Sequence, residues 1–176
     1  RDANGIMRMQ LNNKNLFQYG PLDQGWWPDG LYTAPTDEAL LYDIVKTKDW
    51  GFNMIRKHVK VEPARWYYHK EGILVWQDMP SGDMGNQWAP HTYNGGTDKE
   101  RSSASIANYY QEWKEIMDLC VSHPSVVVWV PFNEAWGQFD TEKVAEWTKN
   151  YDPSRLVNPA SGGNHRACGD ILDLHN

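Results

Sequence analysis

The sequence lacks several features that would assign the chain to a specialised class of protein. Its 176 residues contain only two cysteines, Cys120 and Cys168, and their spacing indicates neither a CxxC motif nor a disulfide framework. No apolar run approaches the length that crosses a bilayer. Neither a Gly-x-Gly-x-x-Gly loop nor a Gly-Lys-Ser/Thr phosphate loop occurs, which argues against nucleotide binding. The cellular location stays open, and a periplasmic or secreted location is compatible with this composition.

Positive charge and phenylalanine are also scarce. The 17 Lys and Arg residues are outnumbered by 23 Asp and Glu, and the net charge of −6 argues against nucleic acid and against a membrane as partners. Only 4 Phe stand beside 10 Trp and 9 Tyr. Because Trp and Tyr join an apolar ring to a polar edge, this excess suggests a cleft that stacks on a sugar, and a Trp-rich core is the alternative.

The most informative stretch is an unbroken apolar run at residues 126–131. It is rich in β-branched residues and too short for an ordinary helix, so it predicts a strand that is buried on both faces. Asn133 and Glu134 come directly after it, and Trp136 follows two residues later. A carboxylate beside a core is costly unless it is satisfied or used, so Glu134 is the first catalytic candidate. A helix cap or a partner of an arginine is the alternative for this residue.

Short apolar strands alternate with helical patterns along the rest of the chain. An Asn-rich turn at residues 11–15 predicts an N-terminal hairpin, and residues 22–34 are expected to form a surface loop near a site. Strands are predicted at 16–19, 52–55, 73–76, 126–131, 155–158 and 170–176. Helices are predicted after an N-cap at Thr36, from 62 to 72, from 106 to 120, and after Asp140 or Thr141. The long connection at 79–103, which carries Trp88, His91 and Tyr93, is expected to be functional.

This order of elements requires parallel strands joined by right-handed crossovers, as in a doubly wound sheet or a (β/α)8 barrel. A barrel gathers all of its strand ends at one mouth, whereas an open sheet uses mainly those at its switch point. Polar residues follow nearly every predicted strand, which favours the barrel: Arg56, His58, Asp78, Asn133, Glu134, Asn158, His175 and Asn176. Six strands are too few for a complete barrel. We therefore predict an α/β fold, an incomplete (β/α)8 TIM-type barrel with a hairpin lead-in, in which residues 1–176 are part of a larger protein.

Four segments resemble the catalytic barrel of the family 2 glycoside hydrolases, the group of β-galactosidases, β-glucuronidases and β-mannosidases. They are residues 12–20, 51–58, 72–78 and 123–134, the last of which ends in Asn133-Glu134. The resemblance implies that Glu134 is the general acid/base of a retaining β-glycosidase and that Asn133 contacts the sugar 2-hydroxyl. It also implies that Arg56 shapes the subsite, and that the nucleophile is a Glu beyond the sixth strand and therefore outside this chain.

The remaining expectations concern the walls of the site. Asp78, His58, Trp136 and His175 are further candidates for substrate binding, with terminal β-linked sugars such as β-galactosides as substrates. Trp26, Trp27 or Trp88 could also form a sugar platform, and Trp129, Phe132 and Trp136 are expected to surround and desolvate Glu134. Arg56 and Asp78 could instead be an ion pair that holds the strand ends, and His175 could have no role.

Two rival functions remain at this point. A non-catalytic carbohydrate-binding domain would use the same aromatic cleft, and a barrel aldolase would use Lys57 for Schiff-base chemistry. No cofactor is demanded, and Mg²⁺ or Na⁺ could bind at the barrel mouth although no metal-ligand spacing requires it. A partial barrel has two unpaired sheet edges, which predicts either self-association or poor solubility, and the chain alone is expected to be hydrolytically inactive.

Overall fold

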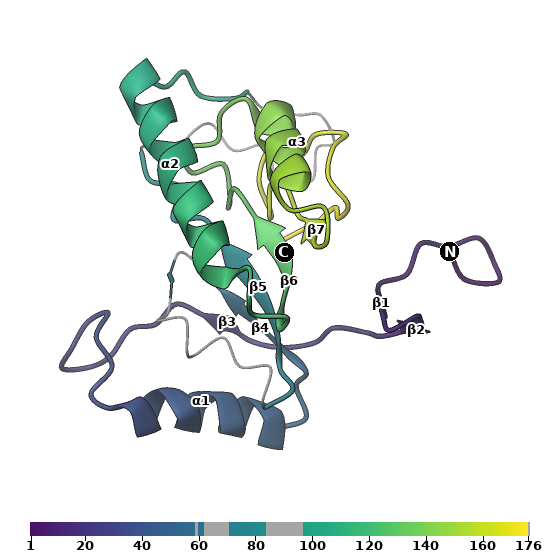
Figure 1. Ribbon diagram of the computed structural model, residues 1–176, viewed down its shortest axis with the longest axis vertical. Coiled ribbons are helices and arrows are strands. Elements are labelled where there is room, and N and C mark those ends of the chain that lie inside the picture. Colours follow the sequence, from purple (N-terminus) through teal and green to yellow (C-terminus); the bar gives the residue numbers. More distant parts are fainter. Residues whose placement is uncertain (59, 62–70, 84–96, 176) are drawn as a thin grey trace.

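The computed structural model of the protein describes residues 1–58, 60–61, 71–83 and 97–175. Its main layer is a parallel sheet with the strand order β3-β4-β5-β6-β7 (Figure 1). Strands that are consecutive in the sequence are therefore neighbours in the sheet, as in the wall of a TIM-type barrel, and the predicted incomplete barrel is confirmed. The strands are β3 (Leu22–Asp23), β4 (Met54–Lys57), β5 (Leu74–Asp78), β6 (Val126–Val130) and β7 (Leu156–Val157).

In the described part of the chain three helices connect these strands. The first and the third begin where the sequence predicts, whereas the second begins at residue 103 and not at 106. Helix α1 (Asp37–Asp49) is capped by Thr36, whose side chain accepts the N–H of Ala39, as expected. Helix α2 (Ser103–Cys120) is capped in the same way by Ser102. Figure 1 shows α1 near β3 and β4, while α2 and α3 (Thr141–Tyr151) accompany the later strands.

The core lies between α2 and the outer face of the sheet. Tyr109, Trp113 and Met117 form a buried stripe on α2, and they pack in one cluster with Trp129 of β6 and Phe132. The rings of Trp113 and Trp129 meet edge to face with centroids 5.5 Å apart, and the Trp113 indole N–H donates to Thr148 on α3. The prediction that the aromatic stripe of this helix is core is confirmed. Two of the Trp residues, Trp113 and Trp129, are thus part of the core.

The predicted hairpin is present as β1 (Gln10–Leu11) and β2 (Lys14–Asn15), which pair antiparallel. Asn12 and Asn13 at its turn have positive φ angles of 51° and 63°, which Asn tolerates better than most residues. The predicted strand at 16–19 is wrong, because the first sheet strand is β3, inside the segment that we expected to be a loop. β3 pairs with β4, and Lys57 Nζ on β4 donates to the Asp23 carboxylate over 2.6 Å.

Two further predictions about strands need correction. β4 extends to Lys57, so Arg56 and Lys57 lie within the strand rather than after it. Residues 170–175 form no strand, because the Asp170 carboxylate accepts the N–H of Val157, a donor that a regular ladder would need. The predicted helix at 62–72 and the aromatic loop residues Trp88, His91 and Tyr93 fall largely or wholly outside the described residues. No helix in the described part of the chain has the length and apolarity to cross a membrane.

A polar network anchored on Asp152 fastens the end of α3 to the sheet. Its carboxylate accepts the indole N–H of Trp129 at 3.0 Å and a guanidinium N–H of Arg155 at 2.6 Å, and the backbone N–H of Ser154 at 3.0 Å. Burial opposes the ionisation of this carboxyl, but the hydrogen bonds from Ser154, Arg155 and Trp129 lower the pKa of Asp152 to about 2. The ionised form therefore stabilises the fold.

We expect Asp152→Ala to lower the free energy of unfolding at neutral pH by about 2 kcal/mol, the value that a pKa lowered from 3.8 to about 2 implies. Because the pKa of Asp152 is depressed in the folded state, its contribution is present above about pH 4 and is lost as the pH falls towards about 2. Urea unfolding across this range measures the effect, with the exposed Asp49→Ala as control. An equal deficit at neutral pH and at about pH 2 would contradict this account.

Candidate active site

The polar residues at the carboxyl ends of three neighbouring strands meet in one hydrogen-bonded cluster. Arg56 on β4 donates to Asp78, the last residue of β5, through Nε–Oδ1 at 2.9 Å and Nη2–Oδ2 at 2.8 Å. The same Nη2 donates to the side-chain oxygen of Asn133 over 2.7 Å. The Asn133 amide nitrogen then lies 3.4 Å from Oε2 of Glu134. The structure therefore groups these residues at the carboxyl ends of the strands, as the sequence predicts.

The Arg56–Asp78 pair is buried, with side chains that are 8% and 1% exposed. A buried charge pair holds its geometry well when the remaining donors and acceptors are satisfied, which the bidentate contact and Asn133 achieve here. The ion pair that we kept as an alternative is thus present. It does not remove Arg56 from the site, because the same guanidinium orients the Asn133 amide.

Glu134 occupies a strained turn directly after the loop that leaves β6. Its φ is 49° and that of Ala135 is 63°, so two consecutive non-glycine residues are left-handed, at a cost of about 1–2 kcal/mol each. The Glu134 N–H donates to the Ser161 carbonyl over 2.9 Å, which ties this turn to the loop after β7. The Glu134 side chain is 39% exposed. The expected enclosure by Trp129 and Phe132 is wrong, since both of those rings are fully buried in the α2 core.

Two histidines complete the cluster. Nδ1 of His175 lies 3.1 Å from Oε1 of Glu134, so this late residue reaches the site although no strand carries it there. His58 lies one residue after β4, and the Gln24 amide nitrogen lies 2.9 Å from its Nδ1. Burial and the neighbouring Arg56 charge lower the pKa of His58, against the opposite influence of Glu134. A neutral His58 imidazole is therefore favoured at neutral pH.

Trp136 is the candidate that the hydrogen-bonded cluster does not include. Its backbone N–H donates to the Asn133 carbonyl, and the residue is 55% exposed. The other proposed platform residues lie elsewhere. Trp26 and Trp27 line a cavity of about 300 Å³ between α1 and the β3–β4 edge, together with Lys57. Lys57 is 4% exposed and bonded to Asp23, so the structure offers the aldolase alternative no support.

Sequence reasoning missed two groups that contact the cluster. The Ser161 hydroxyl lies 3.1 Å from Nε2 of His175 and donates to the Asp173 carboxylate over 2.5 Å. A Gly-rich loop at 161–164 was the available signal, but its position opposite Glu134 depends on strand pairing. Among the described residues, no group of three or more His, Cys, Asp or Glu side chains could hold a metal ion.

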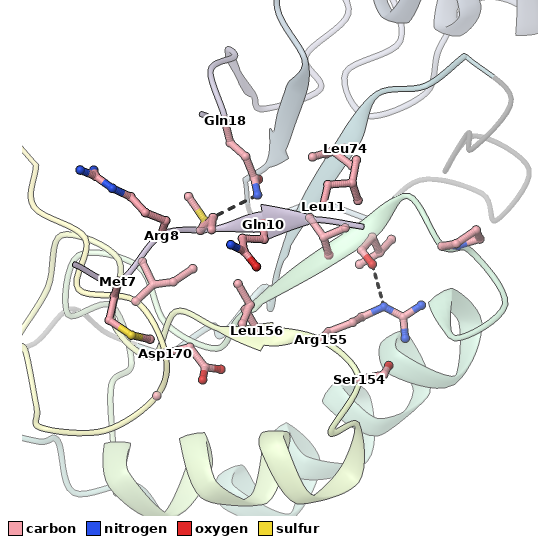
Figure 2. A pocket seen from close by; sticks show the side chains of 16 residues that line it. Met7, Arg8, Gln10, Leu11, Gln18, Leu74, Ser154, Arg155, Leu156 and Asp170 are labelled. Carbon is pink, nitrogen blue, oxygen red and sulfur yellow. Dashed lines mark hydrogen bonds between the residues drawn. The ribbon is translucent and has the colours of Figure 1, made fainter. Parts of the chain in front are cut away.

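A cavity of about 800 Å³ lies at the other end of the strands (Figure 2). Figure 2 shows Gln10 and Leu11 of the hairpin passing over Leu74 and Leu156, which are the first residues of β5 and β7. Because Asp78 is the last residue of β5 and Leu74 the first, this cavity and the cluster lie at opposite ends of the strands. None of the predicted site residues lines the cavity.

A carboxyl group, an amide and two imidazoles thus lie beyond the carboxyl ends of parallel strands, which is where barrel enzymes carry their active sites. The model of a family described as "Glycosyl hydrolases family 2, TIM barrel domain" matches residues 34–174. The chain belongs to this family, and the resemblance seen in the sequence is confirmed.

Individual relatives agree with this assignment. A β-galactosidase of Vibrio vulnificus is 27% identical over 167 residues, which are 94% of this chain and 15% of the relative. A β-galactosidase of Halalkalibacterium halodurans is 30% identical over 132 residues, covering 69% of this chain and 12% of the relative. The chain thus spans about one seventh of the length of the Vibrio relative.

Solved structures show the same fold. A Ruminococcus gnavus β-glucuronidase in complex with uronic isofagomine superimposes with a TM-score of 0.69 at 19% identity, covering 85% of this chain and 27% of that one. A β-glucuronidase of Dictyoglomus thermophilum gives a TM-score of 0.67 at 18% identity with the same coverage.

The buried ion pair leads to a prediction about stability. We expect Asp78→Asn to lower the free energy of unfolding by about 3 kcal/mol, because it leaves the Arg56 charge buried without a counter-charge. Adding Arg56→Met should recover part of this loss, since the double variant holds no buried charge at this pair. Urea unfolding of the two variants measures both effects. Asp118→Asn, which breaks an exposed pair with Lys114, is the control and should change stability little. A double variant less stable than Asp78→Asn would contradict this explanation.

Proposed function

We propose that this chain provides the acid/base half of the active site of a retaining β-glycoside hydrolase that acts on terminal β-linked sugars such as β-galactosides. The observation that carries the proposal is the position of Glu134, a partly exposed carboxyl at the barrel mouth held between Asn133 and His175. The sequence relatives named as β-galactosidases support the sugar class.

In such a reaction Glu134 first protonates the departing glycosidic oxygen and then activates water on the same face of the sugar. The Arg56 guanidinium holds the Asn133 side chain in one orientation. Its amide N–H groups can therefore bind a sugar hydroxyl next to the reacting bond without first losing side-chain conformational entropy. Nδ1 of His58 accepts from the Gln24 amide, so a neutral His58 carries its proton on Nε2 and can donate it to a sugar hydroxyl. Trp136, with 55% of its surface exposed, is available to stack on the sugar face.

A retaining mechanism needs a second carboxylate about 5–5.5 Å from the first. The two Asp residues that take part in the cluster are already engaged. Asp78 binds Arg56, and Asp173 accepts hydrogen bonds from Asn158 and Ser161. The family resemblance implies that the nucleophile is a Glu after a later strand, and we assign it to a residue outside these 176, in a longer polypeptide whose remaining strands would cover the β3 and β7 edges. The proposal predicts that this chain alone does not turn over substrate, and that its open edges self-associate.

In the longer gene product, we expect Glu134→Ala to lower kcat/KM for phenyl β-galactoside by about 10²–10⁴-fold. The loss should be much smaller for a dinitrophenyl β-galactoside, whose leaving group needs no proton. Azide should restore turnover of that activated substrate by forming the β-galactosyl azide. Initial rates and product analysis measure these effects, with Glu146→Ala on the exposed face of α3 as the control.

Three outcomes would contradict parts of the proposal. Turnover by the 176-residue chain that Glu134→Gln abolishes would place the nucleophile within it. Equal losses for both leaving groups, without azide rescue, would remove the acid/base role from Glu134. Sugar binding by calorimetry without hydrolysis of any aryl β-glycoside by the longer product would instead support the carbohydrate-binding alternative, for which the exposed Trp136 ring is the favouring observation.

A further inference from the structure

The imidazole of His175 is held on both of its nitrogen atoms. Nδ1 lies 3.1 Å from Oε1 of Glu134, and Nε2 lies 3.1 Å from the Ser161 hydroxyl oxygen. The ring also packs against Gly162. A Cβ atom built at this position would lie 2.2 Å from the ring, and its φ of +64° is left-handed, so only glycine leaves room for the imidazole there. These contacts leave the ring little freedom to turn.

The protons of this chain of groups can be assigned from their chemistry. The Ser161 hydroxyl has one proton, and it lies 2.5 Å from Oδ2 of Asp173. An ionised carboxylate can only accept, so the Ser161 proton is directed at Asp173. The Ser161 oxygen must then accept from His175, which requires a proton on Nε2.

With Nε2 protonated, a hydrogen bond across the 3.1 Å between Nδ1 of His175 and Oε1 of Glu134 needs one proton on either of these two atoms. Either the carboxylic acid donates to the neutral ring, or the imidazolium donates to the carboxylate. In both cases Oε1 is held by His175, and Oε2, which lies 3.4 Å from the Asn133 amide nitrogen, is the oxygen left to face a substrate.

A competing arrangement exists. Nη1 of Arg56 lies 3.5 Å from the same Nε2, and because a guanidinium only donates, this contact would need an unprotonated Nε2. The Ser161 contact is shorter by 0.4 Å, the difference between 3.5 and 3.1 Å, and the proton on Ser161 is already committed to Asp173. The protonated Nε2 is therefore favoured.

We propose that Asp173, Ser161 and His175 form a positioning chain that fixes the tautomer of His175 and thereby directs Oε1 of Glu134 away from the substrate. The catalytic role of these three residues rests on the proposed function, whereas the tautomer of His175 does not. His175 is thus a positioning residue that acts through Glu134.

The tautomer can be measured directly in the 176-residue chain by long-range ¹H–¹⁵N correlation spectra of the histidine rings, assigned with His175→Asn. We expect Nε2 of His175 to carry a proton in the wild type. Asp173→Ala frees the Ser161 proton to point at Nε2, so the Nε2–H signature should be lost. Asp173→Asn keeps an acceptor oxygen and should retain it, which separates the hydrogen bond from the charge. Asp170→Asn is the matched control in the same segment.

An unprotonated Nε2 in the wild type, or an Asp173→Ala spectrum that keeps the wild-type tautomer, would overturn the proposal. Backbone amide spectra report whether each variant folds. If Asp173→Ala does not fold, Ser161→Ala tests the same series of hydrogen bonds. Because these spectra need no hydrolysis, the absence of activity with the expected tautomer would overturn only the proposed function.

The longer gene product provides the catalytic readout. His175→Asn retains an N–H near the Nδ1 position, so it should keep more of kcat than His175→Phe, which is expected to lose about 10–100-fold, with KM changed little in both. Equal losses of kcat in the two variants would contradict the positioning role, since a purely structural ring would be replaced better by Phe.

Discussion

One guanidinium group determines the arrangement of the site. Arg56 binds Asp78 with two hydrogen bonds and Asn133 with a third, so it joins the ends of β4 and β5 to the loop after β6. The pair is almost completely buried, and the low polarity of this environment makes a misplaced or missing partner expensive. The interaction that joins the strand ends therefore also fixes the Asn133 amide. The position of Glu134 depends on this amide and on the left-handed turn at residues 134–135.

The stability of the domain and the chemistry of the site come from opposite faces of the same strands. On the outer face, Val75 of β5 and Trp129 of β6 pack with Trp113 of α2 in a close-packed core. On the inner face, alternate residues of the same strands bring Arg56 and Asp78 to the mouth. Because successive side chains of a strand point to opposite faces, the core can be apolar while the mouth is polar. The two parts remain connected, since the Tyr109 hydroxyl donates to the carbonyl of Pro131, just before Asn133.

The sequence allows prediction of those features that depend on local patterns. The stripe on α2, the N-cap at Thr36 and the buried run of β6 each have a periodicity or a cap that is visible in the chain, and polar residues at strand ends led to the barrel mouth. Features that depend on a distant partner were wrong or missed. β3 has only two residues and exists because β4 pairs with it. Asp140 is the N-cap residue of α3 as expected, but its side chain makes no cap bond, and the N–H of Thr141 donates to Asp98, forty-three positions earlier. The high Trp content also indicated a cleft, yet Trp113 and Trp129 are fully buried in the core, and Trp26 and Trp50 are exposed away from the cluster.

The strained turn at Glu134 shows why the loop after β7 has its particular composition. With Glu134 and Ala135 left-handed, the backbone reverses within two residues and points the Glu134 N–H at the Ser161 carbonyl. That bond requires the two loops to approach closely. A Cβ atom at Gly163 would lie 2.7 Å from the Ala135 nitrogen, so a side chain there would force the loops apart. The hydrogen bonds across this contact offset the cost of the turn. Residues 133–135 and 161–163 therefore act as one unit, in which Glu134 and Ser161 both lie within hydrogen-bond distance of the His175 imidazole.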